Sequence, residues 1–462
     1  MSSTSKASID TAYWRARLND AIAKYKVPGA AMGILRDGQI VDVAAGVLSK
    51  ATLVEATPDS VFQIGSISKV WTTTMLMQLV DEGKLSLDTP VVEVLPEFGT
   101  PDPEVTKAVT VRHLLTHSSG LDGDLFTDTG RGDDCVEKYV AVLTEAGQNH
   151  PVGATFSYCN AGFIVAGRII EVLTDKTWDA ALRERIIEPL GLTATVTLPE
   201  EAIVHRAAVG HLGDPGTEPR PSPHWVLPRN AGPAGLITAR VHDVLAFARM
   251  HLAGGVAPDG TRILSAASVE AMQGQEIALP DPIETDSWGL GWMRFDWGGH
   301  RIIGHDGGTI GQAAFLRLSP ERDFAVSLLT NGGDPQGLYH ELYAEVFGEL
   351  ADVDMPPAFA PPEEPVTIDL APYVGRYSRS SVDIDVVEQD DGLVIRSTVT
   401  GLIAELVPED ERTEETALIP VAEHQFATKQ ETAASWSSVL FYELDDGSRY
   451  VHHGFRATPR VD

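Results

Sequence analysis

Cysteine, basic residues and long apolar runs are all scarce in this sequence. It has two cysteines, Cys135 and Cys159, which excludes a disulfide framework or a multi-cysteine zinc site and predicts two buried structural thiols. It has 35 basic and 66 acidic residues, and the resulting formal net charge of −31 would repel nucleic acid. No stretch of about 18 apolar residues occurs, and the beginning of the chain lacks the apolar core of a signal peptide. We therefore expect a cytoplasmic protein with neither nucleic acid nor membrane as a partner.

Chain length and proline distribution predict two domains. A chain of 462 residues, 43% of them hydrophobic, exceeds what one core usually supports. Prolines are dense from Pro356 to Pro365, where they favour an extended spacer. We expect a catalytic domain at 1–355, a linker at 356–366 and a second domain at 367–462.

Hydrophobic periodicity in the first domain predicts an α+β fold. Asp37-Gly38 is typical of a tight hairpin turn between two strands, and helical segments dominate from about 100 to 280, interrupted by loops such as 213–228. This order predicts an antiparallel sheet flanked by helices, with an α-rich subdomain inserted between its strands. The expected elements are helices at about 9–25, from 66 to a stop at Gly83 and around 338–350, and strands at 30–35, 39–45, 61–64, 301–303, 313–318 and 324–329.

The last hundred residues have a strand pattern. Val382, Ile384 and Val386 alternate with polar residues, and turns are expected at Asp390-Asp391-Gly392 and at Gly447. A small all-β barrel or sandwich is therefore predicted for the second domain.

Ser66-Ile67-Ser68-Lys69 is the first candidate site. A Ser-x-x-Lys pair is expected about once by chance in a chain of this length, and residues 3–6 also match it. Ser66 begins a helical pattern, where it could serve only as an N-cap. A lysine in the first turn opposes the helix dipole, however, and at i, i+3 spacing it can reach the Ser66 hydroxyl. Burial and the dipole would lower the pKa of Lys69 toward that of a usable base.

Tyr158-Cys159-Asn160 is the second candidate, just before another helical pattern. Tyr158 could be only a core aromatic and Asn160 only an N-cap. A phenol beside a lysine is chemically apt, because the cation favours the phenolate and the pair can pass a proton from nucleophile to leaving group.

His305-Asp306-Gly307-Gly308 is the third candidate, and we expect it to form a turn after a strand that ends at Gly304. Such a segment could be only a solvated loop. Glycine would nevertheless let a backbone N–H approach a ligand closely, as an oxyanion hole requires.

Together the three motifs resemble those of the β-lactamase-related serine hydrolases, which include class C β-lactamases, D-aminopeptidases, D,D-carboxypeptidases and certain esterases. Segments at 113–121, 235–236 and 288–292 look like theirs too, so the resemblance spans about residues 15–350. It implies the β-lactamase/transpeptidase-like fold. It also implies that Ser66 forms an acyl-enzyme, with Lys69 and Tyr158 as the general acid/base system and without metal or cofactor.

The resemblance assigns the substrate contacts as well. Asn160 would orient the acyl side chain and Lys69. The N–H groups of Ser66 and Gly308 would form the oxyanion hole at the Gly307-Gly308 pair, and His305 would contact the substrate or the leaving group.

Position 305 departs from β-lactamases and cell-wall transpeptidases, which usually carry a lysine there that binds the substrate carboxylate. Histidine, partly charged near pH 7, is what esterases and aminopeptidases of the family tend to show. The expected substrate is therefore an ester, amide or thioester of a small acyl, D-amino-acid or peptidyl group. A D-aminopeptidase or a weak β-lactamase stays open as an alternative.

The C-terminal domain resembles the lipocalin-like appendages of some D-amino-acid peptidases and of penicillin-binding-protein-type thioesterases. Those thioesterases release and cyclise nonribosomal peptides, so a carrier protein or a peptide synthetase would then be a partner. The motifs do not separate hydrolysis from aminolysis, and they leave the oligomeric state open.

Other functions fit the sequence less well. His117-Ser118-Ser119-Gly120 lacks the first glycine of a nucleophile elbow and is interpreted as a structural turn. No His-Glu-x-x-His motif occurs, and strand alternation would send His452 and His453 to opposite faces, so a metal hydrolase is not expected. The presence of all three motifs disfavours a non-catalytic peptide-binding receptor.

Overall fold

The computed structural model describes residues 9–213, 217–364, 366–390, 392–404, 409–430, 433 and 435–462. The second Ser-x-x-Lys match, at residues 3–6, lies outside them. So do Asp391 of a predicted turn, Pro365 of the predicted linker and residues 214–216 of a predicted loop.

An eight-stranded antiparallel sheet forms the centre of the first part of the chain, in the order β2-β1-β12-β11-β10-β9-β8-β7. Strands from before and after the helical region pair directly, because β1 lies between β2 and β12. The α+β prediction is thereby confirmed. The strands are β1 (Gly29–Arg36), β2 (Gln39–Gly46), β7 (Ile277–Ala278), β8 (Ser287–Trp288), β9 (Met293–Trp297), β10 (His300–Thr309), β11 (Gln312–Ser319) and β12 (Phe324–Thr330).

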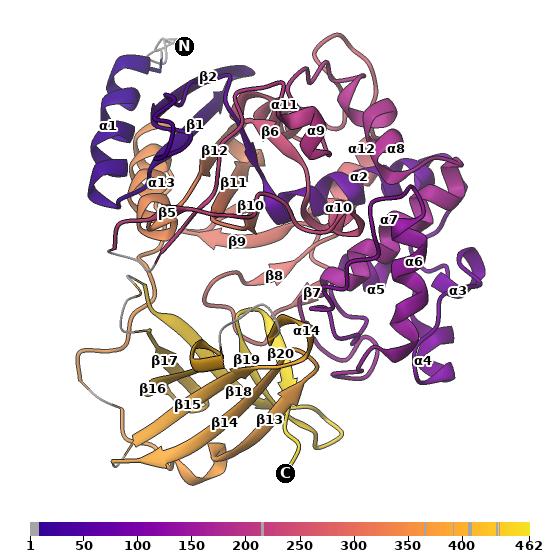
Figure 1. Cartoon of the computed structure of the whole chain (residues 1–462), viewed down its shortest axis with the longest axis vertical. Helices are drawn as coiled ribbons and strands as arrows, with labels where there is room; N and C mark the ends of the chain where they lie inside the picture. Colours follow the sequence, from indigo (N-terminus) through magenta and orange to yellow (C-terminus); the bar gives the residue numbers. More distant parts are fainter. Residues whose placement is uncertain are drawn as a thin grey trace.

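Helices cover both faces of this sheet (Figure 1). On one face, α1 (Thr11–Lys24) and α13 (Pro335–Ala351) pack on alternate residues of β1 such as Ala30 and Met32. On the other face, α11 (Val241–Leu252) packs so closely that a Cβ at Gly33 would lie 2.6 Å from the Leu245 side chain. The period of two along β1 therefore divides the core into two apolar layers.

The inserted residues between β2 and β7 form the α-rich subdomain. Its centre is α2, which is buried on all sides and contacts α7 and α10. The hydroxyls of its buried threonines donate to backbone carbonyl oxygens, Thr72 to Pro233, Thr73 to Lys69 and Thr74 to Val70. The subdomain also holds a small sheet of β3 (Val61–Gln63) and β6 (Thr238–Arg240). Its helices are α2 (Ser68–Asp81), α3 (Val91–Val94), α4 (Pro103–Ala108), α5 (Val111–Leu115), α6 (Cys135–Val142), α7 (Asn160–Thr174), α8 (Trp178–Leu182), α9 (Pro199–Ala202), α10 (Gly232–Gly235) and α12 (Ala266–Gln273).

The third motif is not a turn, which corrects the prediction. β10 continues through His305, Asp306, Gly307 and Gly308 to Thr309, and the chain reverses only at Ile310-Gly311. Glycine suggested a turn because it weakens strands. Here it is required by a close approach, since a Cβ at Gly307 would lie 1.9 Å from the Ile64 carbonyl oxygen.

The C-terminal residues form an eight-stranded antiparallel barrel, β13 to β20 in sequence order, as predicted. It is nearly closed, because Tyr377 of β13 pairs with Arg460, the residue after β20. Figure 1 shows it packed against the first part of the chain near β7 and β8. Among the described helices, none is long and apolar enough to cross a membrane. The strands are β13 (Gly375–Arg379), β14 (Val382–Gln389), β15 (Gly392–Val399), β16 (Thr413–Ala422), β17 (Gln425–Thr428), β18 (Ser437–Glu443), β19 (Arg449–His453) and β20 (Arg456–Pro459).

Candidate active site

Ser66 lies in a 3₁₀ turn, Gly65–Ile67, between β3 and α2. Gly65 has a φ of 53°, and a Cβ there would lie 2.6 Å from the Gly308 nitrogen. A Cβ at Gly307 would lie 3.0 Å from the Ser66 nitrogen. Glycine at both positions lets the backbone of β10 lie directly on the turn that carries Ser66. Space beside Gly308 is open, so its peptide borders a cavity.

Lys69 reaches Ser66 from the first turn of α2. Its Nζ lies 2.9 Å from Ser66 Oγ and 2.7 Å from the Ala234 carbonyl oxygen. The side chain is completely buried. Burial lowers the pKa of Lys69 well below its usual value, and the positive charge of Arg456 lowers it further. This shift favours the neutral amine, which lies beside the hydroxyl whose proton it can accept.

Tyr158 lies over the same lysine, with its ring centroid 4.9 Å from Lys69 Nζ. His117 stacks on the phenol ring at 4.2 Å and accepts a hydrogen bond from the Cys159 N–H at 2.9 Å. Cys159 in turn caps α7, since its Sγ accepts from the Gly162 N–H. The N-cap is therefore Cys159 and not Asn160, which is the first residue of the helix.

Burial raises the pKa of Tyr158, while a hydrogen bond to Ser66 and the charge of Arg456 oppose the increase. The phenol therefore stays protonated, contrary to the expectation that a lysine cation would favour the phenolate. The expectation assumed a charged lysine, whereas burial neutralises Lys69 and Tyr158 together.

Asn160 lies at the edge of the site and is held by a buried carboxylate. Its Nδ2 donates to Asp124 Oδ1 at 3.1 Å. Asp124 also accepts from Arg379 at 2.9 Å and from Arg456 at 2.9 and 3.0 Å. Although burial alone would raise it, these guanidinium groups lower the pKa of Asp124 to about 2. The carboxylate is therefore ionised and fixed, and it orients Asn160.

His305 is buried, with its ring 6.2 Å from that of Tyr158. Its Nδ1 lies 2.6 Å from the Asp306 carbonyl oxygen, so Nδ1 carries the proton and Nε2 presents a lone pair. Burial lowers the pKa of His305 to about 3, and the positive charge of Arg317 acts in the same direction. The partly charged histidine expected from the sequence is therefore neutral here, because burial penalises its cation.

A hairpin of the barrel completes the site. The Phe455 carbonyl oxygen accepts a hydrogen bond from the Tyr158 N–H at 2.8 Å, and the Arg456 guanidinium lies 5.0 Å from the Tyr158 ring centroid. Gly454 and Phe455, between β19 and β20, have φ values of 55° and 66°. Such a conformation is uncommon for phenylalanine and costs about 1 kcal/mol or more, so packing must maintain it.

The sequence-predicted site residues other than Lys69 line one cavity of about 460 Å³, and Lys69 is buried behind Ser66. Most of its other lining side chains are apolar, which suits an apolar acyl group. Ser118 and Ser119 are buried elsewhere in the structure and do not line it, so they fit the predicted structural turn. The cavity brings together Ser66, Tyr158, Asn160, His305, Gly307 and Gly308 with Leu125, Phe126, Ile164, Leu227, Trp288, Phe315, Phe455 and Arg456.

Four residues of the site were not identified from the sequence. Asp124, His117, Phe455 and Arg456 belong to none of the three motifs, and Asp124 and Arg456 meet across 332 positions. His117 lies in the 113–121 segment of the resemblance, but nothing there indicated its contact with Tyr158. The Gly454-Phe455 turn predicts a hairpin without indicating where it docks.

Known proteins resemble the chain along its whole length. The Beta-lactamase family profile matches residues 14–347. Penicillin-binding protein 4 of Amycolatopsis lactamdurans is 48% identical over 373 residues, 80% of this chain and 98% of that protein. The D-aminopeptidase of Brucella anthropi is 28% identical over 298 residues, 62% of this chain and 53% of that protein. The crystal structure of SurE with D-Leu matches with a TM-score of 0.76 and 25% identity, covering 98% of this chain and 99% of that one.

Proposed function

The chain belongs to the β-lactamase family of serine hydrolases, and from that premise we propose that Ser66 forms an acyl-enzyme with D-aminoacyl or D-terminated peptidyl substrates. The observation that carries the proposal is the 2.9 Å contact between a buried lysine amine and the Ser66 hydroxyl. The same cavity walls then serve ester, amide and thioester donors, because all three give one acyl-enzyme.

Acylation begins with proton transfer. Lys69, neutral because it is buried, accepts the Ser66 proton while Oγ bonds to the carbonyl carbon. Tyr158, held as a phenol, donates a proton to the departing nitrogen, oxygen or sulfur atom and recovers one from the Lys69 ammonium. Water or an amine then attacks the acyl-enzyme, and Lys69 and Tyr158 act in the reverse direction.

We place the oxyanion hole where the backbone of β10 contacts the turn that carries Ser66. The N–H groups of Ser66 and Gly308 would stabilise the negative charge that develops on the carbonyl oxygen. The two glycines that let these backbone segments touch, Gly65 and Gly307, support this assignment.

The substrate class follows from the Nε2 lone pair of His305. A neutral acceptor receives a hydrogen bond from an amide N–H or an ammonium group, and it repels a carboxylate. This chemistry favours aminoacyl and peptidyl substrates over β-lactams. Two likenesses support the D configuration, one to a D-aminopeptidase and one to the structure with D-Leu, which extends over the barrel as well.

A second candidate is transfer of a peptidyl thioester to an amine within the same chain. The apolar cavity wall supplied by the barrel hairpin favours it, since excluding water slows hydrolysis. A cytoplasmic address and a carrier protein or peptide synthetase as the acyl donor belong to this second proposal.

The test uses the full chain and two measurements. A fluorophosphonate should add one adduct at Ser66 by intact and peptide mass spectrometry. Matched D-Leu and L-Leu p-nitroanilides and a D-terminated peptidyl thioester should then be compared, with hydrolysed and cyclised products quantified separately. No adduct from several probes on folded protein, or faster turnover of the L substrate, would contradict the proposal.

A further inference from the structure

Arg317 of β11 carries a buried charge on the face of the sheet that α13 covers. Its side chain is 2% exposed, and its guanidinium lies 4.3 Å from the Phe295 ring centroid and 5.0 Å from that of Tyr339 on α13. The side chain crosses β10 at Gly304, where a Cβ would lie 2.8 Å from Arg317 Cδ. Removing a charge from water costs several kcal/mol, so a buried arginine requires an anionic partner.

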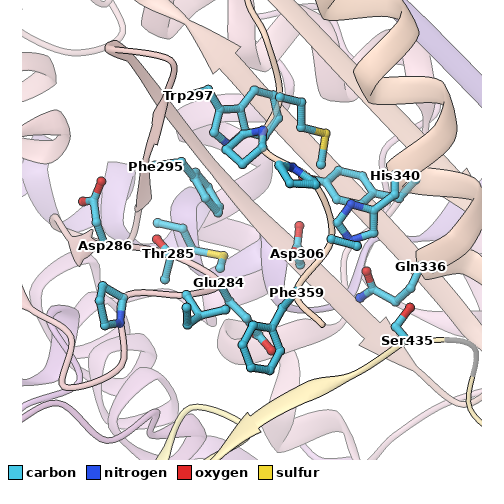
Figure 2. Close-up of a pocket in the computed structure, with 18 of the residues that line it drawn as sticks. Glu284, Thr285, Asp286, Phe295, Trp297, Asp306, Gln336, His340, Phe359 and Ser435 are labelled. Atoms are coloured by element: carbon cyan, nitrogen blue, oxygen red, sulfur yellow. The ribbon is translucent and has the colours of Figure 1, made fainter. Parts of the chain in front are cut away.

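Asp306 of β10 is that partner. Arg317 Nη1 and Nη2 donate to its Oδ1 and Oδ2 at 2.5 and 3.0 Å, a forked contact that a lysine cannot make. Figure 2 shows Asp306 and Phe295 in the wall of a cavity of about 320 Å³, and Asp306 lines the cavity at Ser66 as well. The ion pair therefore lies directly beside the candidate active site.

Asp306 is the last residue of β10 that has a side chain before the two glycines of the site. Gly307 and Gly308 have no side chain that could fix the strand, and glycine weakens strands. The Asp306 carbonyl oxygen also accepts the hydrogen bond from His305 Nδ1 at 2.6 Å. Strand alternation sends the His305 side chain to the opposite face, where its ring lies 6.2 Å from that of Tyr158. Fixing the Asp306 side chain therefore fixes the peptide units on both sides of it.

A buried ion pair adds little net stability, because the desolvation of both charges offsets their attraction. We propose that the Arg317–Asp306 pair instead positions the end of β10 for acyl transfer, by holding the Gly308 N–H in the oxyanion hole and the His305 ring at the substrate. Arg317 and Asp306 are positioning residues, since they act through the β10 backbone. The inference rests on the proposed acylation of Ser66 and adds the residues that keep its oxyanion hole in place.

The experiment compares two double variants of the full chain that carry the same substitutions. Asp306→Asn/Arg317→Met removes the buried pair without leaving an uncompensated charge. Asp286→Asn/Arg301→Met is the matched control. Arg301 also lies on β10 and donates to both Asp286 carboxylate oxygens, at 3.0 and 2.7 Å, but neither residue lines the cavity at Ser66. The probes are D-Leu p-nitroanilide and the boronic acid analogue of D-leucine, whose tetrahedral adduct with Ser66 resembles the transition state.

For Asp306→Asn/Arg317→Met, kcat should fall about 10²-fold while KM stays within about threefold of the wild type, because acylation and deacylation use the same oxyanion hole. The inhibition constant of the boronic acid should rise about 10²-fold too, because its adduct occupies that hole. The control should keep both constants. Arg317→Lys keeps the charge without the fork and should also lower kcat, which separates geometry from charge.

The end point of fluorophosphonate labelling counts the active Ser66 in each preparation. A pair that served only the fold would lower this count or the unfolding midpoint, and would leave kcat per active Ser66 unchanged. That result, or wild-type affinity for the boronic acid, would reject the positioning role.

Equal losses in the two double variants, or a loss confined to KM, would reject it too. Should Asp306→Asn/Arg317→Met fail to fold, Arg317→Lys decides by the same two constants. No labelling of the wild type would instead reject the acyl-enzyme itself.

Discussion

Two neighbouring clusters of buried ionisable groups differ in charge: one is neutral, and the other is charged but paired. At Ser66, burial removes the charge, so Lys69, Tyr158 and His305 are neutral. Under the barrel hairpin, Asp124 and Arg456 keep their charges because they pair with each other. Proton transfer needs groups that can gain or lose a proton, whereas positioning needs groups that cannot. The difference suggests that the second cluster is there to hold the first in place.

The largest effect is expected from removing the neutral amine. Lys69→Ala should slow acylation of Ser66 by about 10³-fold or more, because the general base is lost. The fold should survive, since no buried ion pair is broken. The time course of adduct formation by mass spectrometry measures the rate, and circular dichroism checks the fold. Normal turnover by this variant would remove Lys69 from the proton path.

The paired cluster should respond mainly in stability. Asp124→Asn leaves Arg456 and Arg379 without their anion and should cost about 3–5 kcal/mol of unfolding free energy. Urea unfolding followed by tryptophan fluorescence measures it. Glu104→Gln is the control, because it breaks the exposed ion pair with Lys107 and should barely move the midpoint. Equal urea midpoints for the two variants would show that the Asp124 cluster does not stabilise the fold more than an exposed ion pair does.

A smaller effect should connect the clusters. The positive charge of Arg456 lowers the pKa of Lys69, so Arg456→Met should raise it. Acylation requires unprotonated Lys69 and is lost as pH falls through that pKa, so the acidic limb of kcat/KM should move to higher pH. Arg449→Met, at an exposed barrel arginine paired with Glu443, is the matched control. An unshifted limb would show that the hairpin does not influence the base.

The smallest expected effect is a chemical shift of His305 that does not change with pH. Because the pKa of His305 is lowered to about 3, its ring should stay neutral from pH 8 down to pH 5. The histidine NMR signal that disappears in His305→Gln should therefore keep its chemical shift across this range. A titration midpoint between pH 6 and 7 would show that the His305 ring is partly protonated near neutral pH, which contradicts the assignment.

Local signals allowed much of the fold to be predicted. The hairpin at Asp37-Gly38 has φ values of 50° and 75°, and α1 begins one residue after its Asp10 cap, so periodicity and turn chemistry located both. The extension of β10 through Gly307 was missed because glycine pairs suggested a turn, whereas these residues pair with β11. The reason for glycine at 307, the close approach of Ile64, is distant in sequence. The domain boundaries at 355 and 367 remain predictions.

The candidate site divides in the same way. Ser66, Lys69 and Tyr158 belong to compact motifs whose residue types already indicate their chemistry. Asp124 and Arg456 are ordinary surface residues by type, and only folding brings them together to form a buried pair. The neutral state of His305 could not be predicted from the sequence either, because it depends on burial by residues from several elements.

The hairpin at Phe455 is synthesised after the rest of the active site, because it lies near the end of the chain. A ribosome makes Ser66, Lys69 and Tyr158 long before it makes Phe455 and Arg456, so the growing chain carries its nucleophile without one wall of the cavity. A message broken anywhere within the barrel would yield an unfinished pocket, with Asp124 lacking Arg456. We expect such fragments to be inert toward acyl donors, because the cavity at Ser66 lacks the wall that the hairpin supplies.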